Sequence, residues 1–304
     1  MHLGITKFHV NRHIKQFTLM NVWNWKLFIF LIIIKIRLYV SASNCLITLR
    51  TFGDSHSETP LIEAFKNIPN HLKHHFKGFT YSGSGKLMFS MARDGINITE
   101  LLKTPKMAYL RPWAPHERRY PKFNLKVPGV VLTHQVGSAP TISERDILYF
   151  DVGEVDARQM LGLRIQKGLL RIENVESEIN GIVDRYVARI KTAVEEVPAK
   201  TVWIGGLFAQ PLVNENINGA SPITGSWSQR QLHVELINKR LKMHSEIEGF
   251  VFMDFSEGYS NPGGDLNMTM SDGNHHLNVW TEKTKNEFAA RFVEQFERFC
   301  GQLI

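Results

Sequence analysis

Two short loops, far apart in the chain, contain residue types that could together carry out acyl transfer. Ser55 lies in TFGDSHSE, directly after the apolar run CLITLR, and Asp272 and His275 lie in SDGNHHLN near the other end. Nucleophilic acyl transfer needs a hydroxyl, a base that takes its proton and a group that orients the base. The spacing of Asp272 and His275 would let the carboxylate contact one ring nitrogen while the other nitrogen faces Ser55.

Either motif alone is weak evidence, and other roles stay open. Ser55 could instead cap the helix that follows it, because serine is a favoured N-cap residue. Asp54 could brace the turn. A phosphate or nucleotide site at the same place is disfavoured, because the chain has neither GxxxxGK[ST] nor GxGxxG.

Apolar, strand-like runs alternate with helical patterns along the chain, which is typical of an α/β fold with a mainly parallel sheet. The expected strands are 45–52, 78–82, 146–153, 201–208 and 249–255, and the expected helices are 59–68, 86–95, 173–196, 228–242 and 281–302. Sites of such sheets lie at the carboxyl ends of the strands, so the GDS, GSG, GEVD and SDGNHH loops should converge on one edge.

The stretch 104–145 is the least regular part of the sequence. It contains six prolines, and we expect an irregular insertion or lid loop there, although VVLTHQV within it could form a strand.

The placement of the two loops resembles that in the SGNH hydrolase superfamily, the GDSL-type esterases and lipases. The first block is Gly53-Asp54-Ser55, the last is Asp272-Gly-Asn-His275, and the resemblance spans about residues 44–304. The stretch YFDVGEVDAR (Tyr149–Arg158) is similar to the GEID-R signature of an uncharacterised branch of that superfamily. The resemblance implies a flavodoxin-like α/β/α three-layer sandwich with a five-stranded mainly parallel sheet, and no metal or organic cofactor.

The same resemblance implies an activity and roles for the residues. Ser55 would be the nucleophile, His275 the base and Asp272 the group that orients it, in hydrolysis of an ester. The substrate would be a small-molecule or carbohydrate ester, with an acetyl group on a sugar as the first guess. An O-acyltransferase would use the same machinery, and a glycan- or partner-binding member of the fold with little catalysis is the alternative.

One position departs from the family pattern. The superfamily has Gly-x-Asn-Asp after the third parallel strand, whereas this chain has Gly153-Glu-Val-Asp156, and the Val155 side chain cannot donate a hydrogen bond to an oxyanion. The remaining donors would be the backbone N–H groups of Ser55 and of a glycine in the GSG loop. Arg158 could add positive charge, or it could simply pair with Glu154 or with Asp156. The residues expected around the oxyanion and substrate are Gly83, Gly85, Gly153, Asp54 and Arg158.

The charge distribution argues against a nucleic-acid partner. The formal net charge is +7, but residues 1–53 hold seven Lys or Arg and no acidic residue. Subtracting these seven from 36 leaves 29 basic residues against 29 acidic ones, so the rest of the chain is neutral and its composition does not support a basic nucleic-acid face.

The N-terminal segment is expected to lie outside the hydrolase-like domain, with residues 1–43 as a basic and apolar segment and 44–304 as the domain. The run LFIFLIII is shorter than the roughly 20 residues of a spanning helix but long enough for a signal-peptide core. The expected localisation is therefore cytoplasmic, or else secreted or membrane-attached through residues 20–42.

Cysteine usage does not indicate a disulfide framework. Cys45 and Cys300 are the only two cysteines, and neither belongs to a zinc-binding pattern. A bridge between them is open, but we expect both to behave as small buried apolar residues.

Overall fold

A computed structural model of the chain describes residues 27, 29–30, 45–53, 63, 65–82, 88–98, 107–112, 130–135, 141–212, 223–270 and 280–301. It divides into two compact units. One comprises Met1–Cys45 and Phe296–Ile304, and the other comprises Leu46–Gln295. The sheet and most of the described motif residues belong to the second unit.

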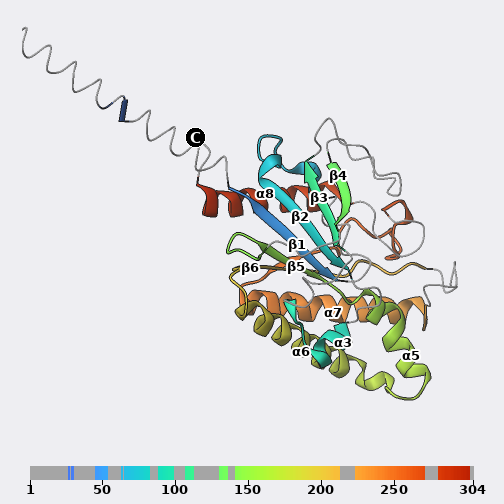
Figure 1. Cartoon of the computed structure of the whole chain (residues 1–304). Helices are drawn as coiled ribbons and strands as arrows, with labels where there is room; N and C mark the ends of the chain where they lie inside the picture. The colour runs from blue at the N-terminus through green and yellow to red at the C-terminus, as the bar shows by residue number, and fades with distance from the viewer. Residues whose placement is uncertain are drawn as a thin grey trace, which may run out of the picture. The chain divides into compact units, whose positions relative to one another are not determined.

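A seven-stranded sheet forms the centre of the second unit, in the order β4-β3-β2-β1-β5-β6-β7 (Figure 1). Five neighbouring strands are parallel, in the order β2-β1-β5-β6-β7 across the sheet. If only these five strands are numbered, in the order in which they occur in the chain, their order across the sheet is 2-1-3-4-5. This is the flavodoxin-like order. The α/β fold class and its five-stranded parallel sheet are thereby confirmed. The parallel strands are β1 (Ile47–Gly53), β2 (Phe76–Ser82), β5 (Ile147–Asp151), β6 (Thr201–Gly205) and β7 (Val251–Met253).

Two antiparallel strands extend the sheet beyond β2, within the stretch expected to be an irregular insertion. They are β3 (Met107–Pro112) and β4 (Val130–Gln135), and β3 pairs with both β2 and β4. The expectation of an insertion without regular structure is therefore wrong for these residues. The expected strand VVLTHQV is confirmed as β4. The terminal Pro112 of β3 is compatible with a strand because it stands at its end.

Helices cover both faces of the sheet. In Figure 1, α3, α6 and α7 lie on one face and α8 on the other, which gives three layers. The α-helices whose bounds lie within the described residues are α3 (Met88–Asp94), α5 (Leu161–Gln166), α6 (Val175–Glu195), α7 (Trp227–Glu248) and α8 (Glu282–Cys300). Shorter elements are the 3₁₀ turns η2 (Lys73–His75), η4 (Ile172–Asn174) and η5 (Met268–Met270) and the π-helical turn η3 (Asp156–Met160).

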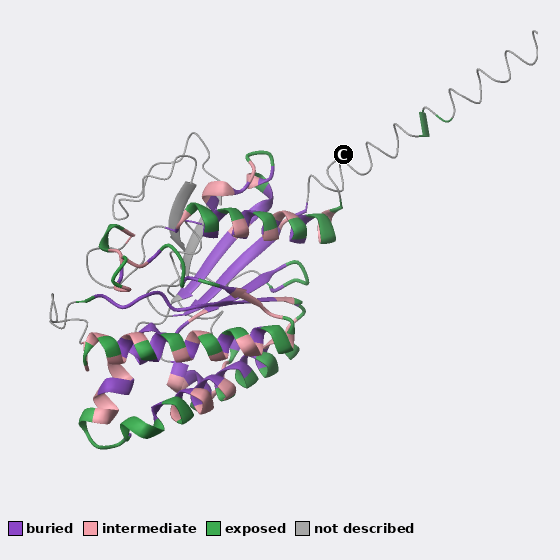
Figure 2. Cartoon of the chain, turned by 180° about the vertical axis from the view of Figure 1, so that it is seen from behind, coloured by how far each residue is buried: buried purple, intermediate pink, exposed green. Residues whose placement is uncertain are grey.

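The sequence explains why these elements form where they do. All seven residues of β1 are buried, as expected for a central parallel strand covered on both faces. In α6 the buried residues recur every three or four positions, from Val175 to Ala193, so one side of the helix packs on the sheet (Figure 2). Helix α7 begins with a capping box between Ser226 and Gln229.

A buried ion pair connects β1 to the segment before β5. The Arg50 Nε donates to Asp146 at 2.5 Å, and both side chains are almost fully buried. The same guanidinium donates to the Tyr81 hydroxyl at 2.9 Å and to the Thr141 carbonyl at 3.2 Å, and Ser143 donates to the second Asp146 oxygen. A buried charge is tolerated only with such partners, so this network connects the middle of β1 and the end of β2 to the segment before β5.

The two cysteines form a disulfide within the first unit. Cys45 and Cys300 are joined with a Cα–Cα distance of 5.7 Å and a sequence separation of 255. The expectation of two small buried apolar thiols is therefore wrong. The bridge joins the residue two positions before β1 to the last residue of α8.

The N-terminal apolar run is described only at three positions, Leu27, Ile29 and Phe30, which are helical and exposed. Among the residues described, no helix combines the length and apolar character needed to cross a bilayer. The expected localisation, which relied on this apolar segment for secretion or membrane attachment, is therefore corrected.

Candidate active site

The carboxyl edge of the parallel sheet is where the motif loops meet the described structure. Strand β1 ends at Gly53 and its neighbour β5 ends at Asp151, with these two residues paired in register. Because the chain continues from β1 to β2 on one side and returns to β5 on the other, the edge between β1 and β5 is the topological switch point, where α/β sheets bind ligands. The predicted Asp54, Ser55, Gly83, Gly85, Asp272 and His275 lie outside the described residues.

Gly153 follows β5 at this edge, in a conformation that requires glycine. Its φ is +122°, and a Cβ at this position would lie 2.8 Å from the Met88 Cε. The chain therefore turns sharply after β5 while staying in close contact with the start of α3. This is the position that the sequence assigned to the oxyanion and substrate region.

Arg158 is held by its own motif. The Arg158 Nε donates to Glu154 at 2.7 Å, four residues earlier, and both side chains are about 4% exposed. The sequence left two roles open for Arg158, and the structure shows the one in which it pairs with Glu154. The motif lies at the start of a helical segment, because the Ala157 N–H donates to the Gly153 carbonyl and η3 begins at Asp156.

Asp156 has a different partner, the first turn of α3. Its carboxylate accepts from the backbone N–H of Met88 at 2.7 Å and of Phe89 at 3.2 Å. A carboxylate at a helix N-terminus satisfies donors that have no partner within the helix and is stabilised by the helix dipole. Met88 comes three residues after Gly85 in the sequence. The last residue of the GEVD motif therefore fixes the chain at the exit of the GSG loop.

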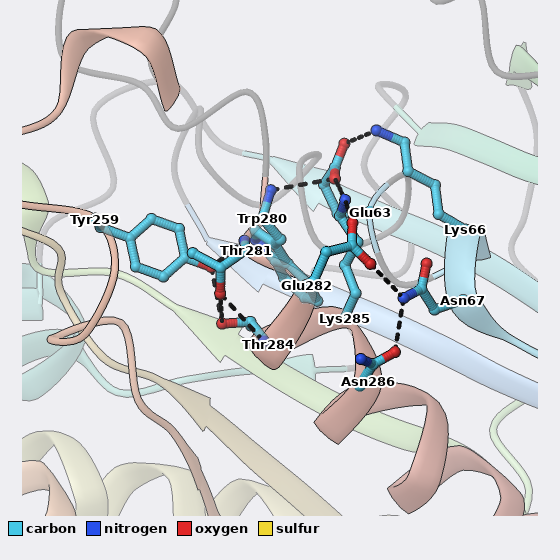
Figure 3. Close-up of polar contacts among 10 residues, drawn as sticks. All are labelled: Glu63, Lys66, Asn67, Tyr259, Trp280, Thr281, Glu282, Thr284, Lys285 and Asn286. Carbon is cyan, nitrogen blue, oxygen red and sulfur yellow. Dashed lines mark hydrogen bonds and ion pairs between the residues drawn. The ribbon is translucent and has the colours of Figure 1, made fainter.

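Glu63, which lies between β1 and β2 in the chain, forms a hydrogen bond to the residue two positions before α8. Its buried carboxylate accepts from the Trp280 backbone N–H at 3.1 Å (Figure 3). Glu63 follows Ser55 by eight residues, and Trp280 follows His275 by five. The hydrogen bond therefore connects chain positions close to the predicted nucleophile with chain positions close to the predicted base.

Tyr259 holds the same end of α8 from the loop after β7. Its hydroxyl accepts from the Thr281 backbone N–H at 3.0 Å and donates to the Thr284 Oγ1 at 2.8 Å (Figure 3). The Trp280 ring packs between Phe255 and Phe288, with ring centroids 5.6 and 5.9 Å away. The start of α8 is thus fixed by buried contacts on two sides.

His233 is a buried histidine that packs against the GEVD motif from α7. Its Nδ1 lies 3.2 Å from the Ala157 carbonyl, and because a carbonyl only accepts, Nδ1 carries the proton. Burial lowers the pKa of His233 below its ordinary value of 6.5; the Ala157 hydrogen bond raises this pKa in part, and the nearby Arg230 charge lowers it further. The folded state therefore favours the neutral ring.

This pKa predicts a loss of stability in acid. The unfolded chain binds a proton at His233 below pH 6.5, whereas the folded state takes it up only at lower pH, so stability falls as the pH falls through this window. The contribution is up to about 1.4 kcal/mol per pH unit. Denaturation between pH 7.5 and 5 should show a smaller slope for His233→Asn, whose amide can still donate to Ala157. Identical slopes for the two proteins would refute the prediction.

Sequence reasoning missed the residues whose contacts hold the start of α8. Glu63 lies in LIEAF, where a charged residue within a helical pattern is typical of a solvated face, and only its flanking apolar residues indicated burial. Tyr259 lies in a loop rich in Gly, Ser and Asn, which gave no signal. Among the residues described, no group of three or more His, Cys, Asp or Glu could hold a metal ion.

Comparisons with known proteins give distant structural similarities alone. No protein-family model matches the chain, and no curated protein matches it. Among solved structures, a lipase from goat rumen metagenome is 11% identical, with 82% of this chain and 97% of that chain covered and a TM-score of 0.44. Phospholipase A1 from Streptomyces albidoflavus is 10% identical, with 81% of this chain and 98% of that chain covered and a TM-score of 0.37. A DUF4886 family protein from Bacteroides uniformis is 12% identical, with 85% of this chain and 97% of that chain covered and a TM-score of 0.37.

The names of these neighbours include hydrolases that act on esters, but similarities of this degree carry no argument about this chain. The parallel sheet and its helices establish the α/β fold directly.

Proposed function

We propose that the chain is a serine esterase-type hydrolase of the SGNH superfamily, with Ser55 as nucleophile, His275 as base and Asp272 as the group that orients His275. The observation that carries this proposal is the hydrogen bond from the Trp280 N–H to Glu63. It supports a short distance between the segment that contains GDS and the segment that contains DGNH, which are otherwise separated by more than two hundred residues of sequence.

The position of β1 supports the same assignment. Ser55 follows the last residue of β1 by two positions, and β1 borders the switch point of the sheet. In this proposal, the Ser55 hydroxyl would lie beside the carboxyl edges of β1 and β5, where α/β sheets bind ligands.

The reaction would proceed in two steps. The Ser55 oxygen attacks the ester carbonyl while His275 takes its proton, and collapse of the tetrahedral intermediate releases the alcohol, which receives that proton. Water then attacks the acyl-enzyme with His275 again as base, and the carboxylic acid leaves. If a sugar hydroxyl replaced water, the same groups would perform O-acyl transfer, so an acetylated carbohydrate would be the substrate of the hydrolase and the product of the transferase.

Val155 favours a second candidate, a member of the fold that binds a glycan or partner with little catalysis. Loss of one oxyanion donor costs about 10²–10³ in rate. The remaining donors would be the backbone N–H groups of Ser55 and of Gly83 or Gly85. The Arg158 guanidinium, paired with Glu154, is a weaker candidate for this role than the sequence alone suggested.

Labelling with a fluorophosphonate probe tests the proposal, because such probes react with an activated serine without needing the natural substrate. We expect labelling of the wild type, none of Ser55→Ala, and a loss of at least about 10³-fold in rate for His275→Ala. Ser57→Ala is the matched control, since Ser57 is two positions from Ser55 in the sequence, and it should label like the wild type.

Two results would overturn the assignment. Label that persists in Ser55→Ala would show that another residue reacts, and a folded wild type without label would favour the binding protein. Circular dichroism of each variant establishes that it is folded before the rates are compared.

A further inference from the structure

Glu63 is a buried carboxylate surrounded by donors from α8 and from its own helical segment. One carboxylate oxygen accepts from the Trp280 N–H and lies 3.9 Å from the Lys285 ammonium, and Lys66 donates to the other oxygen (Figure 3). Glu63 is 1% exposed, whereas Lys66 is 32% exposed. Burying a charge is costly, so a carboxylate kept at this position needs these donors and in turn holds them.

The contacts are concentrated on the first turn of α8. The Thr281 side chain accepts from the Thr284 N–H at 3.2 Å, which makes Thr281 the N-cap of the helix. Glu63 therefore places its negative charge beside the positive end of the helix dipole. Nearby, the Asn67 amide donates to Glu282 at 3.0 Å and to Asn286 at 2.8 Å, so the same helical segment contacts α8 twice.

The position of this contact in the chain gives it a functional consequence. Five residues span at most about 18 Å, so fixing Trp280 limits where His275 can lie. Fixing Glu63 similarly limits the segment that contains Ser55. Tyr259 holds Thr281 from the opposite direction, so the start of α8 cannot shift without breaking buried hydrogen bonds.

We propose that Glu63 is a positioning residue, which holds the segment of Asp272 and His275 in register with the segment of Ser55. The inference rests on the function proposed above. Glu63 itself takes no part in proton transfer. A base displaced by about 1 Å can cost about 10²-fold in rate, so a contact that sets the distance between two catalytic segments influences the rate from outside the reaction.

The experiment compares Glu63→Ala and Glu63→Gln with the wild type by the rate of fluorophosphonate labelling at 25 °C. We expect a decrease of at least about tenfold for the alanine variant. A smaller decrease is expected for glutamine, whose oxygen can still accept from Trp280 but whose amide nitrogen replaces the oxygen that accepts from Lys66. The matched control is Glu257→Gln, because Glu257 pairs with Lys283 at the same helix end but is 74% exposed. It should label within about twofold of the wild type.

Hydrogen exchange of peptides that cover residues 271–285 provides a readout that does not depend on activity. We expect faster exchange there in Glu63→Ala than in the wild type, at temperatures where both remain folded. A folded Glu63→Ala with wild-type exchange and a wild-type labelling rate would overturn the inference.

The Ser55→Ala protein separates the two proposals. If Ser55→Ala is unlabelled and Glu63→Ala labels normally, the positioning role fails while the esterase assignment stands. If the wild type is not labelled at all, the esterase assignment fails and the positioning role fails with it, whatever the exchange of residues 271–285 shows about stability.

Discussion

Arg50→Met is expected to lower the free energy of unfolding by about 3–5 kcal/mol. The substitution leaves the Asp146 carboxylate buried with the Ser143 hydroxyl as its remaining side-chain donor in the described network. It also removes donors from the Tyr81 hydroxyl and the Thr141 carbonyl. The loss of stability comes mainly from the Asp146 carboxylate, which stays buried without its ion-pair partner, because methionine fills a volume similar to that of arginine. Urea denaturation monitored by tryptophan fluorescence gives the measurement.

A second variant distinguishes this explanation from lost packing. Arg50→Met combined with Asp146→Leu removes both charges, and it should recover at least half of the loss, because a buried ion pair replaced by apolar residues is often neutral for stability. Arg93→Met is the matched control, since Arg93 pairs with Asp94 on the surface, and it should leave the denaturation midpoint unchanged. No recovery in the double variant would show that the charge is not the cause.

Reduction of the Cys45–Cys300 disulfide is expected to lower the free energy of unfolding by about 3–5 kcal/mol. The bridge closes a loop with a sequence separation of 255, and a cross-link over so long a loop restricts the unfolded chain strongly. Because reduction lets the unfolded chain expand, it should raise the m value as well as lower the denaturation midpoint.

The measurement compares denaturation with and without reductant, and thiol titration confirms that two thiols appear. Cys45→Ala combined with Cys300→Ala should match the reduced wild type and should not respond to reductant. An equal midpoint for the oxidised and fully reduced wild type would contradict the prediction.

Local patterns in the sequence were sufficient to predict the parallel sheet. The central strand β1 lies in the run CLITLR, which is apolar at most positions, α6 repeats its apolar residues at helical spacing, and Gly95, at φ +90°, closes α3 where expected. Each of these signals comes from residues that are neighbours in the chain, so periodicity and turn chemistry are enough to find them.

Contacts between distant residues could not be predicted in this way. Strand β3 lies in a proline-rich stretch, and its pairing with β2 becomes evident only when the sheet is assembled. The sequence presents Glu63 as a surface residue, because its partner Trp280 is 217 positions away. Cys45 and Cys300 are 255 positions apart, so their spacing in the sequence did not indicate the disulfide either. At the site, the sequence identified candidate chemistry, whereas the roles of Asp156 and Glu63 came from their contacts.

The disulfide also changes what a protease can do to this protein. With Cys45 joined to Cys300, the chain between them is a covalent ring that contains all seven strands and every helix from α3 to α8. One cut anywhere in that ring opens it without releasing a fragment, and two cuts are needed before a piece can diffuse away. A singly nicked molecule would therefore run as one chain on a non-reducing gel and as two on a reducing gel.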